Sequence, residues 1–186
     1  MGKEPYLWIG PADPSARDPV IDPEILAGLA YNRTKLPAPP VRLSPAADKQ
    51  VVNLETYVSF AQGLDRVWVT ASLNYPGIDI AATTVATPTA LHIDAGTSSA
   101  QPSSCTYDLV RKDGGYGVDS EGADCNITYR RSSGDSAYGL KASITWKVIW
   151  TASADPDGPA QQPALPDGET TVEQDVSVRE VQSVNR

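Results

Sequence analysis

The chain has its clearest pattern over residues 138–151, YGLKASITWKVIWT, where apolar and polar residues alternate. All even positions of this stretch are apolar, and the odd positions are small or polar except for Ile149. A repeat of two is typical of a β-strand with one buried face, because successive side chains point to opposite faces of a sheet. A shift of one residue would bury both lysines, so the register is strongly specified. We therefore predict a long strand with Trp146 and Trp150 in the core.

Shorter segments with the same alternation recur along the chain after residue 50. Pro76-Gly77 separates two of them and is typical of a turn between antiparallel strands. The apolar phase changes near Val85 and again near Arg179, which predicts a β-bulge at each place. The predicted strands cover residues 51–60, 66–75, 78–86, 89–94, 106–110, 126–131, 138–151 and 171–184.

The sequence also predicts a helix before this region. Asp22 is a good N-cap residue, and the proline and glutamate that follow it favour a helical first turn, so we predict a short helix over 22–31. Its apolar stripe is predicted to consist of Ile25, Leu26 and Leu29.

The rest of the N-terminal region is rich in proline. Residues 1–20 predict an extended arm, and residues 36–50, with four prolines, predict an extended linker that leads to the strands. We therefore divide the chain into an N-terminal region of arm, helix and linker, 1–50, and a β domain, 51–186.

Strands with one apolar face, joined by turns and loops, are typical of an antiparallel β-sandwich. Strands buried on both faces would show continuous apolar runs instead. The predicted fold is therefore mainly β, an antiparallel β-sandwich with a short N-terminal helix and an extended arm.

Composition excludes several classes of function. The net charge is −8, and without a basic stripe the chain offers little to replace counterions on phosphates, so we expect no nucleic-acid partner. The chain has no apolar run of about 18 residues, so we expect no transmembrane segment. The first eleven residues lack the apolar core of a signal peptide. This leaves a cytoplasmic protein, or a mature chain to which Met1-Gly2 was added.

The two cysteines, Cys105 and Cys125, bear on that choice. Both lie in polar, glycine-rich surroundings, whereas a free cysteine is usually buried as a small hydrophobic residue. Two free thiols are the alternative, and a zinc site is disfavoured because one histidine and two cysteines are too few ligands. We predict a disulfide that closes a loop of about 20 residues. A disulfide favours an oxidising, extracytoplasmic compartment.

Six segments follow one another in a characteristic order: IDPEILAGLA at 21–30, VVNLETYV at 51–58, VATPTALHIDAGTSSAQPSSC at 85–105, DCNITYRRSS at 124–133, the strand at 138–150 and VREVQ at 178–182. In this order they resemble an uncharacterised family of secreted or membrane-anchored actinobacterial proteins. The resemblance implies a PKD-like (immunoglobulin-like) β-sandwich without an assigned activity, although some members carry nucleotide-binding labels. The chain has no glycine-rich phosphate loop to match those labels.

The sequence contains few residues that would support catalysis. The only histidine, His92, is out of phase with its apolar neighbours, which predicts an outward-facing side chain on a strand. No Gly-x-Ser-x-Gly nucleophile elbow is present. Two facing carboxylates could still hydrolyse glycosides. We predict no enzyme activity and no cofactor. Acidic residues in the loop closed by the cysteines are candidate calcium ligands, without EF-hand spacing: Asp113, Asp119, Glu121 and Asp124.

Exposed aromatic side chains are the better candidates for contact with a partner or ligand. Trp68 opposes the apolar phase of its strand, and the others lie in the arm or near the cysteine loop. The alternative is that a second sheet, or the arm with Trp8, covers these side chains. The predicted function is therefore a non-catalytic interaction or structural module, at the cell surface or in a secreted assembly, with a protein or cell-envelope partner. The alternatives are a carbohydrate-binding module that recognises a glycan and, less favoured, a carboxylate-dependent hydrolase. The candidate contact residues are Trp8, Trp68, Tyr107, Tyr116 and Tyr129.

Overall fold

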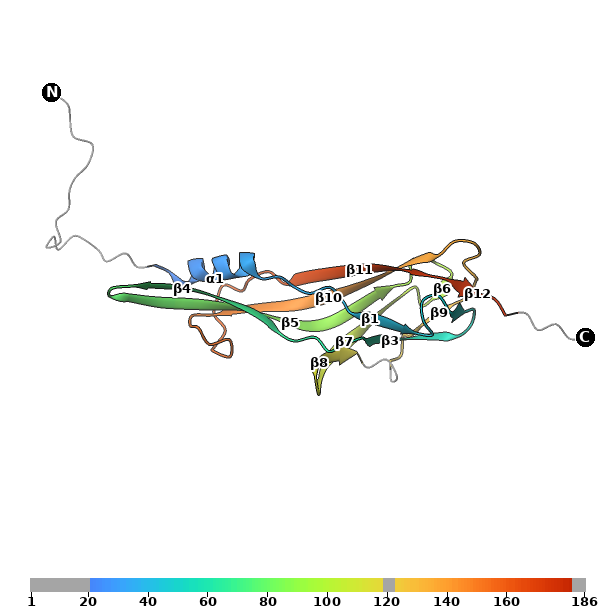
Figure 1. Ribbon diagram of the computed structural model, residues 1–186, viewed down its shortest axis with the longest axis horizontal. Coiled ribbons are helices and arrows are strands. Elements are labelled where there is room, and N and C mark those ends of the chain that lie inside the picture. The colour runs from blue at the N-terminus through green and yellow to red at the C-terminus, as the bar shows by residue number, and fades with distance from the viewer. Residues whose placement is uncertain (1–20, 119–122, 182–186) are drawn as a thin grey trace, which may run out of the picture.

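Two antiparallel sheets account for most of the fold. We describe residues 21–118 and 123–181 of a computed structural model (Figure 1). The larger sheet has the order β11-β10-β5-β7-β8, with β4 also paired to β5, and the smaller has the order β1-β3-β9-β6. The larger sheet contains β4 (Val67–Tyr75), β5 (Ile78–Asp94), β7 (Ser104–Lys112), β8 (Gly115–Val118), β10 (Tyr138–Thr151) and β11 (Gly168–Val176). The smaller contains β1 (Val41–Ser44), β3 (Glu55–Phe60), β6 (Ala100–Gln101) and β9 (Ile127–Tyr129).

The core lies between these sheets. Val58 and Ile127 of the smaller sheet belong to the same buried cluster as Leu91, Leu140 and Ile144 of the larger one. Each sheet thus buries one face against the other, as in a β-sandwich. The prediction of a mainly β, antiparallel fold with a short helix is confirmed.

Strand β10 has the bounds that the alternation predicts. Trp146 is completely buried and Trp150 is 4 % exposed, so both are core residues. A buried indole N–H needs an acceptor. Trp146 Nε1 donates to Thr170 Oγ1 at 2.9 Å, and Trp150 Nε1 donates to the Pro163 carbonyl at 2.9 Å.

Strand β5 differs from the prediction, because it runs for 17 residues where two strands were expected. Its pairing with β4 is regular through Val85, so the bulge predicted there is wrong. The irregularity lies opposite β10, where Trp146 pairs with Pro88 and Thr145 pairs with Ala90. Thr89 is the extra residue of a β-bulge. The bulge interrupts the ladder beside Pro88, which has no N–H to donate to it.

A hairpin of β4 and β5 extends past the end of β10 (Figure 1). Its Pro76-Gly77 turn is the one predicted, with Gly77 at φ 84°, a conformation that favours glycine. Ladder pairing with β10 begins only at Thr83 of β5, so among the described strands the first residues of β5 pair with β4 alone.

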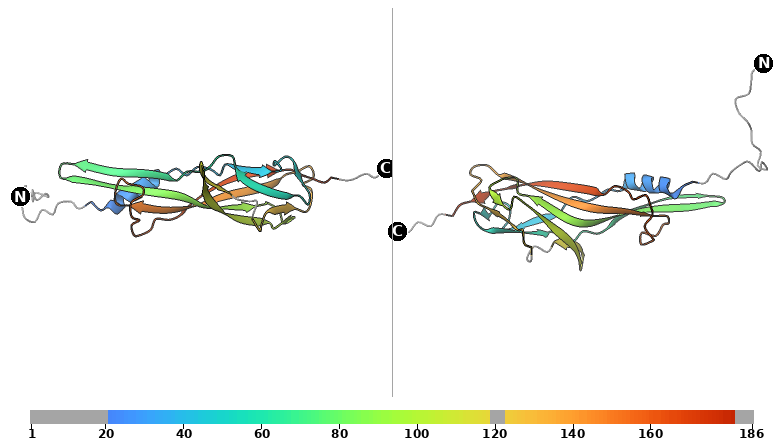
Figure 2. Two further views of the ribbon diagram at one scale, coloured as in Figure 1. Left: turned by 90° about the horizontal axis from the view of Figure 1, so that it is seen from below. Right: turned by 180° about the vertical axis from the view of Figure 1, so that it is seen from behind.

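Helix α1 (Pro23–Arg33) lies along one face of this hairpin, as both figures show (Figure 1, Figure 2). The predicted N-cap is confirmed, since the Asp22 carboxylate accepts from the Glu24 N–H at 3.0 Å. The predicted stripe is only partly correct. Leu26 is buried, but Ile25 and Leu29 are 61 % and 55 % exposed. Small residues replace them in the contact, because Ala27 and Ala30 let the helix approach the sheet closely.

The segment before residue 50 is built into the same sheets. Strand β1 lies inside the predicted linker and pairs with β3. Helix α1 likewise packs on strands that follow the predicted boundary. The strand predicted over 51–60 is interrupted at Asn53, which has φ 63°, and Leu54 is 46 % exposed where burial was expected.

The end of the chain also departs from the prediction. Strand β11 ends at Val176, and the chain then crosses at Ser177 to β12 (Val178–Arg179). β12 pairs in parallel with β2 (Gln50–Val51). Val176 and Val178 are both buried on either side of this crossing, whereas Val181 lies beyond β12 and is 76 % exposed. The apolar phase therefore ends where the strand ends, and the bulge predicted near Arg179 is not formed.

Candidate functional site

A cleft lies where the base of β4 meets the β7–β8 hairpin. Its volume is about 330 Å³, and it lies on the face of β4 opposite helix α1. Two of the predicted contact residues, Trp68 and Tyr116, come together here. The lining residues are Asp65, Arg66, Trp68, Arg111, Gly115 and Tyr116. We call this the Trp68–Tyr116 cleft.

The cleft is formed by a close crossing of two backbones. The Leu64 N–H donates to the Tyr116 carbonyl at 2.9 Å, and the Tyr116 N–H donates to the Leu64 carbonyl at 2.7 Å. Glycines permit this approach: a Cβ on Gly63 would collide with the Gly114 carbonyl, and one on Gly115 would lie 2.7 Å from the Leu64 oxygen. Gly115 also has φ +117°, which disfavours a side chain.

The two aromatic rings have different exposure. Trp68 is 53 % exposed, as its opposite phase predicts, and pairs across the sheet with the buried Val85. Tyr116 is half-buried and pairs with Arg111 of β7. The cleft thus combines an exposed indole with a phenol ring that is more buried.

Charged side chains surround these rings. Arg66 forms an ion pair with Asp157 at 2.8 Å, which fixes its guanidinium on the long connection after β10. Such an exposed pair contributes up to about 1 kcal/mol. Within 21–118 and 123–181, Arg111 makes no salt bridge. Its guanidinium carries five N–H donors. Sequence reasoning missed both arginines and Asp65, since only the fold brings 65–66 and 111 together.

Two other predicted contact residues are in the core. Tyr107 and Tyr129 are 3 % and 0 % exposed, which rules them out as contacts for a partner in this structure. The Tyr107 hydroxyl donates to Asn126 Oδ1 at 3.0 Å, and the Tyr129 ring stacks on Tyr138 with centroids 5.5 Å apart. Trp8 lies outside the described residues.

These buried tyrosines make the fold sensitive to alkaline pH. Burial raises the pKa of Tyr107 and of Tyr129 from 10.0 to about 12. The folded protein then keeps protons that the unfolded chain loses between pH 10 and 12, so the free energy of unfolding should fall across this window. We expect the free energy of unfolding to fall by up to about 1.4 kcal/mol per pH unit for each tyrosine. Urea unfolding at pH 8 to 12 checks this, and Tyr107→Phe should reduce the slope. An equal slope in that variant would contradict the assignment.

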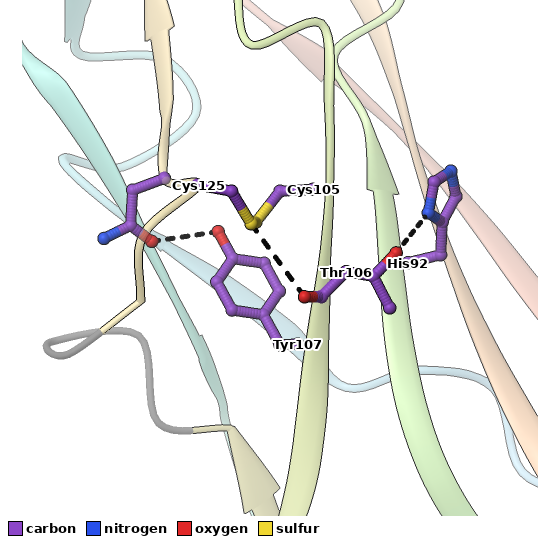
Figure 3. The surroundings of a disulfide bond; sticks show 6 residues. His92, Cys105, Thr106, Tyr107 and Cys125 are labelled. Carbon is purple, nitrogen blue, oxygen red and sulfur yellow. Dashed lines mark hydrogen bonds between the residues drawn. A yellow bond between two sulfur atoms is a disulfide. The ribbon is translucent and has the colours of Figure 1, made fainter.

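Cys105 and Cys125 lie at the predicted disulfide, with Sγ atoms 1.95 Å and Cα atoms 5.4 Å apart (Figure 3). Cys105 is in β7 of the larger sheet, and Cys125 leads into β9 of the smaller sheet. The bond therefore joins the two sheets. His92 is exposed on the outer face, as predicted, and its Nδ1 lies 2.9 Å from Thr106 Oγ1 (Figure 3).

The predicted calcium ligands are not gathered by the described structure. Asp113 and Asp124 are both exposed, whereas Asp119 and Glu121 lie outside the described residues. Over 21–118 and 123–181, no three side chains of the His, Cys, Asp and Glu types come together as a metal site would require.

A search of protein-family models, curated proteins and solved structures finds no match to the chain. Within the part of the chain that the structure describes, no helix has the length and apolar character needed to cross a membrane. The geometry of the Trp68–Tyr116 cleft is therefore the basis for a functional assignment.

Proposed function

We propose that this protein is a non-catalytic binding module at a bacterial cell surface or in a secreted assembly, and that the Trp68–Tyr116 cleft contacts a protein partner. The observation that carries the proposal is the convergence of Trp68, Tyr116, Arg66 and Arg111 on one hollow. Tryptophan, tyrosine and arginine are the residue types that dominate the energetics of protein interfaces, mainly in well-packed pockets.

The charges of the cleft indicate what the partner presents. The chain has a net charge of −8, yet two arginines and one aspartate line this hollow. Arg111 can donate a forked pair of hydrogen bonds, a geometry that suits a carboxylate. A partner segment with an apolar side chain against Trp68 and an Asp or Glu against Arg111 matches this arrangement.

The disulfide supports the extracytoplasmic part of the proposal. Bonds such as Cys105–Cys125 persist in oxidising compartments and are rare where thiols are kept reduced. The resemblance to secreted or membrane-anchored actinobacterial proteins points to the same location.

Removal of the exposed indole tests the proposal. The immobilised protein is incubated with detergent-solubilised envelope proteins of the source bacterium, and the retained proteins are quantified by mass spectrometry. We expect at least one protein that the wild type retains and that Trp68→Ala retains at least tenfold less, since loss of a central anchor costs about 2 kcal/mol or more. Arg111→Glu should give a loss of similar size.

Tyr75→Ala is the matched control, because Tyr75 is an even more exposed aromatic residue, at 66 %, on the other face of the same strand. It should retain the partner at the wild-type level. Equal retention by Trp68→Ala and the wild type would overturn the proposal. A glycan array forms the second arm: sugar binding that Trp68→Ala abolishes, without a protein partner, would assign the cleft to a carbohydrate instead.

A further inference from the structure

Strand β4 has an unpaired edge. Its nine residues pair with β5 on one side, and on the other side no strand of the described chain is paired with them. An edge of this length is a template for another strand, and natural proteins usually block such edges with charges, prolines or a covering segment.

The two long edges of the larger sheet differ in charge. β11, at one edge, carries Glu169, Glu173 and Asp175 at exposed positions, so two such edges would repel each other. β4, with the sequence VWVTASLNY, has neither a charge nor a proline. Two copies can therefore meet along β4 without opposing like charges, despite the net charge of −8.

An apolar flank of α1 lies beside this edge. Pro23 and Tyr31 are on one flank of the helix, where they line hollows with Ala152 and with Val148 on the β10 side. Ile25 and Leu29 are on the opposite flank, since positions two residues away in a helix point roughly the other way. Both side chains are largely exposed, whereas Leu26, Ala27 and Ala30 make the contact with the sheet.

The backbone of the hairpin determines which groups of β4 point outwards. Tyr75 and Ile78 flank a two-residue turn, so they form a hydrogen-bonded pair, and the pattern then alternates along the ladder. The outward N–H and C=O groups are those of Trp68, Thr70, Ser72 and Asn74.

We propose that β4 pairs antiparallel with β4 of a second copy, around a two-fold axis at Ala71. Trp68 then lies opposite Asn74, and Thr70 lies opposite Ser72. This is the one antiparallel register in which all four outward residues are paired. It also brings like faces together, with Val67 opposite Tyr75 on the side covered by α1. A symmetric dimer needs such a self-complementary surface.

The pairing joins the two larger sheets into one continuous sheet. It also brings the two α1 helices, with their exposed Ile25 and Leu29, to the same side of that sheet. Each copy contributes fewer than the roughly 20–30 residues of a standard interface, so we expect a dissociation constant in the micromolar range. The proposal does not rest on the Trp68–Tyr116 cleft or on its partner.

Sedimentation equilibrium of the purified full chain tests the dimer at protein concentrations between about 1 and 100 µM. We expect the mass to rise from 19.8 kDa towards twice that value. Ser72→Pro removes one outward N–H and should remain a monomer, because proline is tolerated on an edge strand whose N–H faces solvent. Ser72→Ala keeps the N–H and should behave as the wild type. Circular dichroism confirms that each variant is folded.

Cross-linking tests the register. Ala71 would face its own copy across the axis, at a Cα separation of about 4.5 Å, which a disulfide can span. Ala71→Cys should therefore form a covalent dimer under mild oxidation. Glu173→Cys, on the exposed β11 edge, should not. A wild type that stays monomeric at every concentration, a Ser72→Pro variant that still dimerises, or equal cross-linking of the two cysteine variants would overturn the proposal.

Discussion

Trp146→Ala is expected to lower the free energy of unfolding by about 3–5 kcal/mol, because it leaves a large cavity in the core. Trp146 is completely buried in the cluster between the two sheets, and its Nε1 donates to Thr170 Oγ1. The substitution therefore removes packing contacts and leaves a cavity where β10 meets its neighbours. Equilibrium unfolding in urea, followed by tryptophan fluorescence and circular dichroism, measures the change.

Trp68→Ala is the matched control for this substitution. It removes the same atoms from an indole that is 53 % exposed, so its effect on stability should stay within about 0.5–1 kcal/mol. Similar losses for the two variants would show that Trp146 is not the core anchor that its burial indicates.

Loss of the disulfide is the second large effect. The Cys105→Ser/Cys125→Ser variant should lose about 3 kcal/mol, because the bond restricts a 20-residue loop in the unfolded chain. The loss should be apparent as a lower urea midpoint in oxidising buffer. In reducing buffer, the urea midpoint of the wild type should approach that of the variant. The midpoint of the variant itself should not change with reductant.

A wild type whose midpoint is the same with and without reductant would contradict this expectation. Thiol labelling of the unfolded, unreduced protein provides an independent check. Labelling of Cys105 or Cys125 in that state would show that the pair is not bonded.

The elements that the sequence predicted well have local causes. β10 follows from alternation alone, α1 follows from the Asp22 cap, and the Pro76-Gly77 turn has the residue types that its geometry requires. Strand β1 was missed because four residues beside prolines carry almost no periodic signal. The continuity of β5 was missed because a bulge at Thr89 changes the apparent phase.

The site was predictable only in part, for a similar reason. Trp68 could be identified because the residues of its own strand define the apolar face, and Trp68 lies on the other one. Tyr107 and Tyr129 could not be separated from exposed aromatics, because their burial depends on pairing between distant strands. The contribution of Arg111 depends on the crossing of Gly63 and Gly115, which is a long-range contact between backbones.

The continuity of β5 has a mechanical consequence. The strand forms part of the hairpin at its start and part of the sandwich at its end, and its ladder with β10 spans the junction from Thr83 to Asp94. The hairpin is therefore joined to the sandwich by one continuous strand, whose ladder with β10 is irregular only at Thr89. A load applied at the Pro76-Gly77 tip would be transmitted along β5 as shear on its hydrogen bonds with β10.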